Sequence, residues 1–175
     1  MRYFEESVET MPRKALETLQ IEKLCSMLEQ IYGRNRFYTD KLDAAGIHPD
    51  SIQTLDDLRR LPLTEKSELV QAQSDALPFG SNTTFEESAY SRFHQTSGTT
   101  GTPLRVLDTP ESWDWWGRCW GHVLAGAGLT ENDRMFVPFS FGPFIGFWAA
   151  VEGAQKINAL MIPGGGRDSL QRLHL

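Results

Sequence analysis

Cysteine is scarce in this chain, and nothing in its spacing points to a metal or a disulfide framework. The two cysteines, Cys25 and Cys119, lie far apart in the sequence, with no CxxC pair and no His/Cys spacing of the zinc type. The opening residues MRYFEESVET also lack the basic region and apolar core of a secretory signal. We therefore expect a cytoplasmic protein with ordinary thiols and no structural metal.

The chain has no excess of basic residues. It contains 17 Lys and Arg and 23 Asp and Glu, which gives a formal net charge of -6. That sign is wrong for a protein that neutralises phosphate backbones, so nucleic acid is not an expected partner. The longest stretch without a charged residue runs from Met135 to Val151 and is broken by prolines and glycines. It falls short of the roughly 18–20 residues that span a bilayer, so we interpret it as protein core.

The chain has enough apolar residues to fold. Its 175 residues correspond to one domain at roughly 150 residues per domain. With 40% hydrophobic and 11% aromatic residues, it can bury a core.

Helical patterns dominate the first 80 residues. Apolar residues recur at helical spacing from Lys14 to Tyr32, and Gly33 ends that pattern. FYTDKLDAAGI fits a short helix closed by Gly46, and in TLDDLRRLP Thr54 is the expected N-cap with Asp57 at the third helical position. A further start signal lies at Thr64. We expect residues 1–80 to form a mostly helical collar.

After residue 80 the pattern alternates between strands and helices. We expect strands at 90–95, 104–108, 134–139 and 159–163, and helices at 110–127, 144–155 and from 167 to 173. This order is typical of a layered α/β sheet with mainly parallel strands. The expected fold class is therefore α/β.

The segment between the first two strands has the composition of an anion-binding loop. Thr96-Ser97-Gly98-Thr99-Thr100-Gly101 is a run of six small residues, four of them hydroxylated. Glycines let successive N–H groups point into one concavity, which suits phosphate oxygens. A flexible hairpin turn is the alternative that composition alone favours. The segment is not a Walker loop, because Thr102 stands where that motif has a lysine.

The string TSGTTGxP resembles the phosphate-binding loop of adenylate-forming acyl-CoA synthetases. MPRKALETLQIEKL, FYTDKLDAAGI, TLDDLRRLPLTEKSEL and FGPFIGFWAAVEGAQKINALMIPGGG are in turn similar to the phenylacetate-CoA ligase branch, in the same order. The resemblance covers nearly the whole chain. Many superfamily members carry a lysine just after the last Gly or the Pro, where this chain has Thr102 and Leu104.

That resemblance implies a two-step ligase. A carboxylate attacks the α-phosphate of ATP to give an acyl adenylate and pyrophosphate, and coenzyme A then displaces AMP. The implied substrates are ATP, coenzyme A and an aryl or acyl acid, with Mg²⁺ as cofactor. The residues implied to bind the phosphates are Thr96, Ser97, Gly98, Thr99, Thr100 and Gly101.

A complete member of the family continues through adenine- and ribose-binding motifs to a small C-terminal lid, whereas this sequence ends at Leu175. The lid lysine and the downstream acidic residue that helps to hold Mg²⁺ are thus missing. We expect residues 81–175 to form an incomplete adenylate-forming core, with little activity alone. A homo-oligomer or a complementary chain is the expected partner, because a sheet with an uncovered face or edge invites association. The alternative is a non-catalytic nucleotide- or anion-binding module that associates with another chain.

Aromatic residues crowd the segment after the third expected strand. Ligands in open α/β sheets bind beyond the carboxyl ends of strands, and the corresponding segment of the phenylacetate-CoA ligase branch contributes to its acyl pocket. Core filling is the alternative at each position. The expected acyl-pocket residues are Phe139, Phe141, Gly142, Phe144, Ile145 and Gly146.

Several other residues have two possible interpretations. Trp113, Trp116 and Trp120 share a helix face and are expected to pack in the core. If part of this cluster is exposed, it would instead mark an interface with the missing part of the enzyme. His94 precedes the phosphate loop and is expected to be structural rather than ligand-binding. His48, His122 and His174 have no recognisable partners. The segment 162–167 is either an anion site at a helix start or a tight turn.

Overall fold

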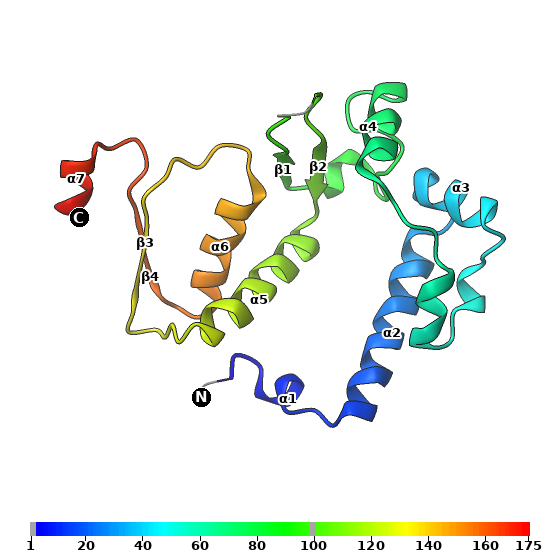
Figure 1. Cartoon of the computed structure of the whole chain (residues 1–175), viewed down its shortest axis with the longest axis horizontal. Coiled ribbons are helices and arrows are strands. Elements are labelled where there is room, and N and C mark those ends of the chain that lie inside the picture. Colours follow the sequence, from blue (N-terminus) through cyan, green and yellow to red (C-terminus); the bar gives the residue numbers. More distant parts are fainter. Residues whose placement is uncertain (1–2, 99–100) are drawn as a thin grey trace. The chain divides into compact units, whose positions relative to one another are not determined.

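The computed structural model describes residues 3–98 and 101–175, and it divides into two compact units. Unit 1 comprises Met1–Glu9, Ser91–Ser97 and Asp108–Leu175, and unit 2 comprises Thr10–Tyr90 and Gly98–Leu107. This division crosses the boundary that we predict at residue 80 and runs through the predicted phosphate loop. Figure 1 gives the order of the elements along the chain.

Unit 2 is helical. It contains α2 (Arg13–Ile31), α3 (Arg36–Ala44), the 3₁₀ turns η1 (Pro49–Ser51) and η2 (Leu55–Arg60), α4 (Lys66–Asp75) and η3 (Glu87–Ala89). Leu28 of α2 and Leu42 of α3 form a buried cluster with Ile47 and Ile52. The helical spacing of the sequence therefore predicts the core correctly, although Met27, which belongs to the same pattern, is half exposed.

The predicted helix ends of unit 2 are largely confirmed. Gly46 follows α3 with a φ of +66°, and the Asp57 carboxylate accepts the Thr54 N–H at 2.9 Å, although the helix it caps is 3₁₀. The start signal that we place at Thr64 is wrong by one residue. Glu65 is the N-cap of α4, because the Glu68 carboxylate reaches back to its N–H at 2.6 Å.

Unit 1 alternates strands and helices as predicted. It contains α1 (Glu6–Glu9), β1 (Arg92–Gln95), α5 (Pro110–Gly126), β3 (Arg134–Val137), α6 (Ile145–Lys156), β4 (Leu160–Pro163) and α7 (Ser169–Leu173). The sheets are two-stranded, with orders β1-β2 and β3-β4, where β2 is Arg105–Asp108. β3 and β4 are parallel, with Arg134 opposite Leu160 and Val137 opposite Pro163. The α/β class is thus confirmed.

Small residues explain how α5 and α6 pack side by side (Figure 1). A Cβ on Gly153 of α6 would lie 2.4 Å from the Cβ of Trp120 on α5, so glycine is needed for this close approach.

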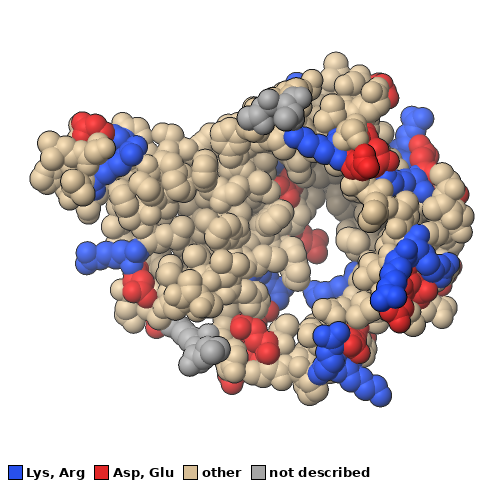
Figure 2. Space-filling model, viewed as in Figure 1, with Lys and Arg blue, Asp and Glu red and all other residues tan. Residues whose placement is uncertain are grey.

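The side chains of β3 alternate in exposure. Val137 is 1% exposed, whereas its neighbour Phe136 is 41% exposed. The outward face therefore keeps apolar side chains, and Figure 2 shows few charged residues across this part of unit 1.

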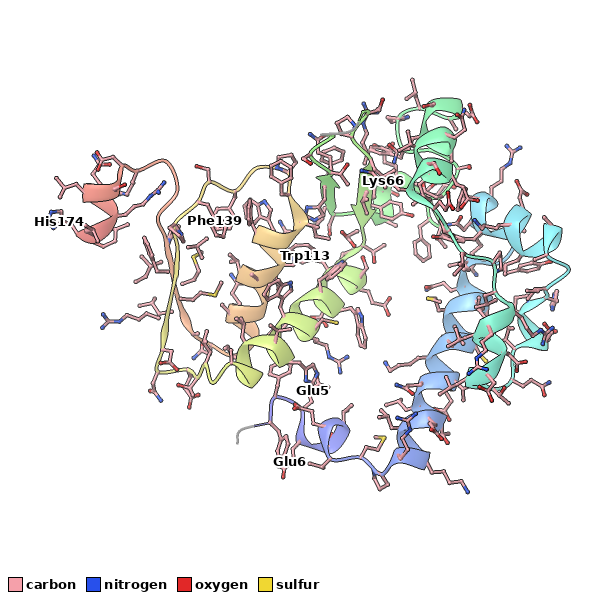
Figure 3. All side chains as sticks on the ribbon, in the orientation of Figure 1. Glu5, Glu6, Lys66, Trp113, Phe139 and His174 are labelled. Carbon is pink, nitrogen blue, oxygen red and sulfur yellow. The ribbon has the colours of Figure 1, made fainter. Side chains whose placement is uncertain are left out.

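The N-terminal segment of unit 1 is attached to α5. The Arg118 guanidinium donates to both oxygens of Glu5 at 2.8 Å, and Figure 3 shows Glu5 pointing toward α5. The His122 ring contacts the Glu9 carboxylate at 3.1 Å and the Phe4 ring edge-on. The expectation that His122 lacks a partner is therefore wrong, because its partners are over 100 positions away in the sequence.

Within the described ranges, no helix is long and apolar enough to cross a membrane.

Candidate functional site

The described part of the predicted phosphate loop curls tightly. Gly98 has a φ of +66°, and a Cβ there would lie 2.8 Å from the Pro103 ring and 2.9 Å from the Gly101 carbonyl oxygen. The Gly101 N–H donates to the Gly98 carbonyl at 2.9 Å, so that this amide closes a turn within the loop. Thr99 and Thr100, which we predict to bind phosphate, lie outside the described residues.

The strand that leads into the loop is joined to the predicted acyl segment. The Gln95 N–H at the end of β1 donates to the Pro143 carbonyl at 2.9 Å. Ser97, which is exposed, follows two residues after Gln95, and Phe144 follows Pro143 directly. Ser91–Ser97 and the acyl segment both belong to unit 1, so this hydrogen bond links the strand that precedes Ser97 to the predicted acyl residues within one unit, whereas Gly98 and Gly101 belong to unit 2.

The carboxyl ends of β3 and β4 meet at one edge, where the acyl segment begins. The Gly164 N–H donates to the Val137 carbonyl at 2.8 Å. A Cβ on Gly165 would lie 2.6 Å from the Phe139 carbonyl oxygen, so glycine is needed where the loop after β4 approaches the loop after β3. This arrangement favours the tight-turn interpretation of residues 162–167. The following helix, α7, is capped by its own Asp168 side chain, which accepts the Gln171 N–H at 2.8 Å.

Aromatic rings line the segment from the end of β3 into α6. Phe139, labelled in Figure 3, has its ring centroid 4.1 Å from that of Phe147, and the Phe144 ring meets Phe147 edge-on. Phe141 packs on Trp148, whose indole N–H donates to the Gly142 carbonyl at 2.8 Å. Phe139 and Phe144 remain 36% and 38% exposed, which leaves part of each ring open to a partner or ligand.

The other predicted acyl residues lie at the start of α6. Phe144 is the N-cap residue, Ile145 begins the helix, and Gly146 follows. A Cβ on Gly146 would meet no atom within 4 Å, whereas one on Gly142 would touch the Phe144 ring at 3.4 Å. Gly146 is therefore exposed and borders open space.

His94 is buried below the loop, as expected of a structural residue. It is 4% exposed, its ring stacks on Trp113 with centroids 5.0 Å apart, and its Nε2 lies 3.6 Å from Oδ2 of Asp108. Burial lowers the pKa of His94, the negative charge of Asp108 opposes that shift, and the Arg92 charge adds to it. The imidazole is accordingly neutral near pH 7.

The tryptophans of α5 differ in how exposed they are, although the sequence places three of them on one helix face. Trp113 is buried and donates its indole N–H to Glu152 of α6 at 2.8 Å. Trp116 is 40% exposed, so the packing predicted for it is not seen in unit 1. Trp115 is 47% exposed, with the Arg118 guanidinium over its ring.

The sequence interpretation missed three residues at this site, which contribute main-chain hydrogen-bonding groups or a linking aromatic ring. Gln95 and Pro143 contribute main-chain groups, which no residue pattern marks. Phe147 links Phe139 to Phe144, and its position three residues after Phe144 on a helix is the signal that would have indicated it.

No family model matches the chain. The phenylacetate-coenzyme A ligase of Escherichia coli (strain K12) is 34% identical over 168 residues, which cover 96% of this chain and 37% of that protein. The ligases of the same name from Aromatoleum evansii and Thermus thermophilus are 30% and 32% identical, over 97% and 93% of the chain. This chain is a relative of the phenylacetate-CoA ligases. It spans little more than a third of their length, as an N-terminal portion would.

Solved structures agree with this relationship. The 2-hydroxyisobutyryl-CoA ligase in complex with 2-HIB-AMP and CoA in the thioesterification state matches with a TM-score of 0.88 and 27% identity, over 97% of this chain and 36% of that one. Its open conformation matches with a TM-score of 0.87 and 25% identity. The predicted α/β fold of an adenylate-forming ligase is thereby confirmed for this portion.

Proposed function

We propose that this chain is the N-terminal portion of an ATP-dependent aryl- or acyl-CoA ligase. The overall reaction converts a carboxylate and ATP into an acyl adenylate and pyrophosphate, and then forms a thioester with coenzyme A. The observation that carries the proposal is the hydrogen bond from Gln95 to Pro143, which joins the segment before the TSGTTG loop to the aromatic segment. A ligase needs its nucleotide phosphates and its acid at one place.

On this proposal, the loop residues act on the pyrophosphate. Negative charge develops on the leaving phosphates as the carboxylate attacks, and fixed O–H and N–H donors stabilise that charge without reorganising. The Ser97 hydroxyl is exposed at the start of the loop and is our first candidate donor. The hydroxyls of Thr99 and Thr100 are assigned the same role from the resemblance.

The aromatic segment would hold the acid. The open sides of the Phe139 and Phe144 rings form an apolar wall, and the free space beside Gly146 leaves room for a side chain or ring of the substrate. An apolar pocket of this kind distinguishes substrates that differ by one methylene by only ~1–3 kcal/mol. The identity of the acid therefore depends on walls that the rest of the protein supplies.

Mg²⁺ is implied by this class of reaction. Within residues 3–98 and 101–175, no group of three or more His, Cys, Asp or Glu side chains is placed to hold a metal ion. The nucleotide phosphates and the remainder of the enzyme are left to bind it.

The test uses the chain joined to the rest of a ligase. We expect the joined protein to catalyse carboxylate-dependent exchange between ATP and pyrophosphate, and Ser97→Ala to lower the exchange rate about 10- to 1000-fold, as the loss of one oxyanion donor does. Ser169→Ala, at an exposed position at the start of α7 and outside both predicted binding segments, is the matched control and should retain the rate. Pyrophosphate binding without any exchange, with every acid tried, would instead favour the non-catalytic binding module.

A further inference from the structure

His94, Asp108 and Ser112 form a buried polar group that the proposed reaction does not use. The Asp108 Oδ1 atom accepts a 3.0 Å hydrogen bond from the Ser112 hydroxyl. Its other oxygen, Oδ2, and both ring nitrogens of His94 are buried and have no hydrogen-bond partner among the described residues. Buried polar atoms without partners are costly, so three at one place require an explanation.

Stacking on Trp113 does not explain the imidazole. A phenyl ring at position 94 would stack on the indole equally well and would leave no nitrogen without a partner. What distinguishes histidine here is Nε2, which faces the Asp108 carboxylate at 3.6 Å. A neutral imidazole with its proton on Nε2 places an N–H donor 3.6 Å from that oxygen, a separation longer than an ordinary hydrogen bond that a small movement of the ring would close.

Both members of the pair are oriented from the first turn of α5. Ser112 donates to Asp108, and Trp113, the next residue, stacks on the His94 ring. The Thr109 side chain caps this turn by accepting the Ser112 N–H at 3.1 Å. The start of α5 therefore fixes where the His94 ring, and with it β1, can lie.

β1 in turn carries the groups that the proposed reaction needs. The residue after His94 is Gln95, which donates to Pro143 of the acyl segment, and Ser97 lies two residues further on. We propose that His94, paired through its Nε2–H with Asp108, is a positioning residue that holds the end of β1 so that Ser97 and the Pro143 segment stay in place. This role rests on the proposed ligase function, although the positioning itself is measurable without catalysis.

Two other charged groups lie near the stacked rings of His94 and Trp113. Arg92, on the same strand, lies over the Trp113 ring at 5.2 Å, and Glu152 of α6 accepts the Trp113 indole N–H on the other side. Neither group touches the His94 nitrogens. Asp108 is therefore the partner to vary.

The experiment compares four variants of this chain by amide hydrogen exchange. His94→Gln places an N–H donor near the position of Nε2, whereas His94→Asn places one near Nδ1. Asp108→Asn removes the facing charge, and His174→Gln, at an exposed position in the same unit, is the control. We expect protection of the Gln95 amide to fall at least tenfold in His94→Asn and Asp108→Asn, and to change by less than about threefold in His94→Gln and the control.

Amides in the last turns of α5, such as that of Leu124, separate local loosening near β1 from general unfolding. Their protection should be unchanged in all four variants. Equal protection of Gln95 in every variant would overturn the proposal, as would a parallel loss at Gln95 and Leu124. Nitrogen-15 spectra of the wild-type ring add a test that needs no variant to fold: a neutral ring with its proton on Nε2 is expected at pH 7, and the Nδ1–H form would contradict the pairing.

Binding of inorganic pyrophosphate links the pair to the proposed function. In the chain joined to the rest of a ligase, we expect the affinity to fall about tenfold in His94→Asn and to be retained in His94→Gln. A joined wild-type protein that binds no pyrophosphate would count against the proposed function, while the exchange pattern at Gln95 would still decide whether His94 positions β1.

Discussion

The amide of Gln95 donates its hydrogen bond to the carbonyl of Pro143, at 2.9 Å. The two residues belong to segments with different predicted tasks, one entering the phosphate loop and the other opening the aromatic segment. Because the bond uses main-chain atoms, side-chain substitution at either position leaves it intact. On the proposed function, the residues that form the acid-binding walls can therefore vary while the hydrogen bond to the segment before the loop is kept.

Gly98 should be among the least replaceable residues of the loop. Gly98→Ala places a Cβ 2.8 Å from the Pro103 ring and keeps a left-handed φ, which costs a non-glycine residue about 1–2 kcal/mol. We expect Gly98→Ala to lower the stability of unit 2 by that amount, as measured by denaturant unfolding. Gly146→Ala, whose Cβ meets no neighbour, is the control and should be neutral or slightly stabilising. Equal effects of the two substitutions would contradict the turn described for Gly98.

Gly146 and Phe144 should set the size of the acid. In the joined ligase, Gly146→Leu fills the open space at the start of α6 and should exclude bulky aryl acids while a short acid still reacts. Phe144→Ala should do the reverse. Since Phe144 is 38% exposed, its truncation should cost less than the ~3–5 kcal/mol of a fully buried ring. An unchanged acid profile in both variants, with melting temperatures retained, would remove these residues from the pocket.

Acidic pH should lower the stability of unit 1, because His94 is protonated more readily in the unfolded chain. Its pKa is lowered in the folded chain by burial, so the unfolded chain takes up a proton first as the pH falls below the ordinary value of 6.5. Stability should therefore fall between pH 6.5 and the lower folded pKa, and His94→Gln should lack this component. All five tryptophans lie in unit 1, so their fluorescence follows its thermal unfolding. Parallel pH profiles for the wild type and His94→Gln would contradict this assignment.

Unit 2 should respond to acid at a lower pH, through Asp57. Hydrogen bonds from the Gln53 N–H, and then from the Thr54 hydroxyl and N–H, lower the Asp57 pKa from 3.8 to about 2. The carboxylate therefore stabilises unit 2 above pH 3.8, and that contribution disappears as the pH falls to about 2. Carbon-13 spectra of the Asp57 side chain should show this titration. A midpoint near 3.8, or one unaffected by Thr54→Val, would be inconsistent with the cap.

Much of the fold is predictable because local rules determine it. The spacing of leucines sets α2, the Thr54–Asp57 pair marks η2, and the alternation of strands and helices after residue 80 identifies the α/β unit. The start of α4 was misplaced because Thr64 and Glu65 both resemble caps. The side chain of Glu68, which reaches the N–H of Glu65, decides between them.

The site is less predictable because its key contacts join distant residues. The loop and the aromatic segment are recognisable as motifs, but nothing in either motif indicates the bond between Gln95 and Pro143. Asp108 lies 14 positions after His94 in the sequence. The two side chains become neighbours only in the folded chain, where both contact the first turn of α5. Arg118 and Glu5 likewise meet only through the docking of the N-terminal segment on α5.

The most direct test of the central claim is a chimera in which this chain replaces the corresponding 168-residue segment of the Escherichia coli phenylacetate-coenzyme A ligase. We measure exchange between ATP and pyrophosphate with a panel of aryl and acyl acids. The account predicts acid-dependent exchange that falls at least tenfold when Ser97 is changed to alanine. A folded chimera that shows no exchange with any acid, or equal exchange with and without the Ser97 hydroxyl, would contradict it.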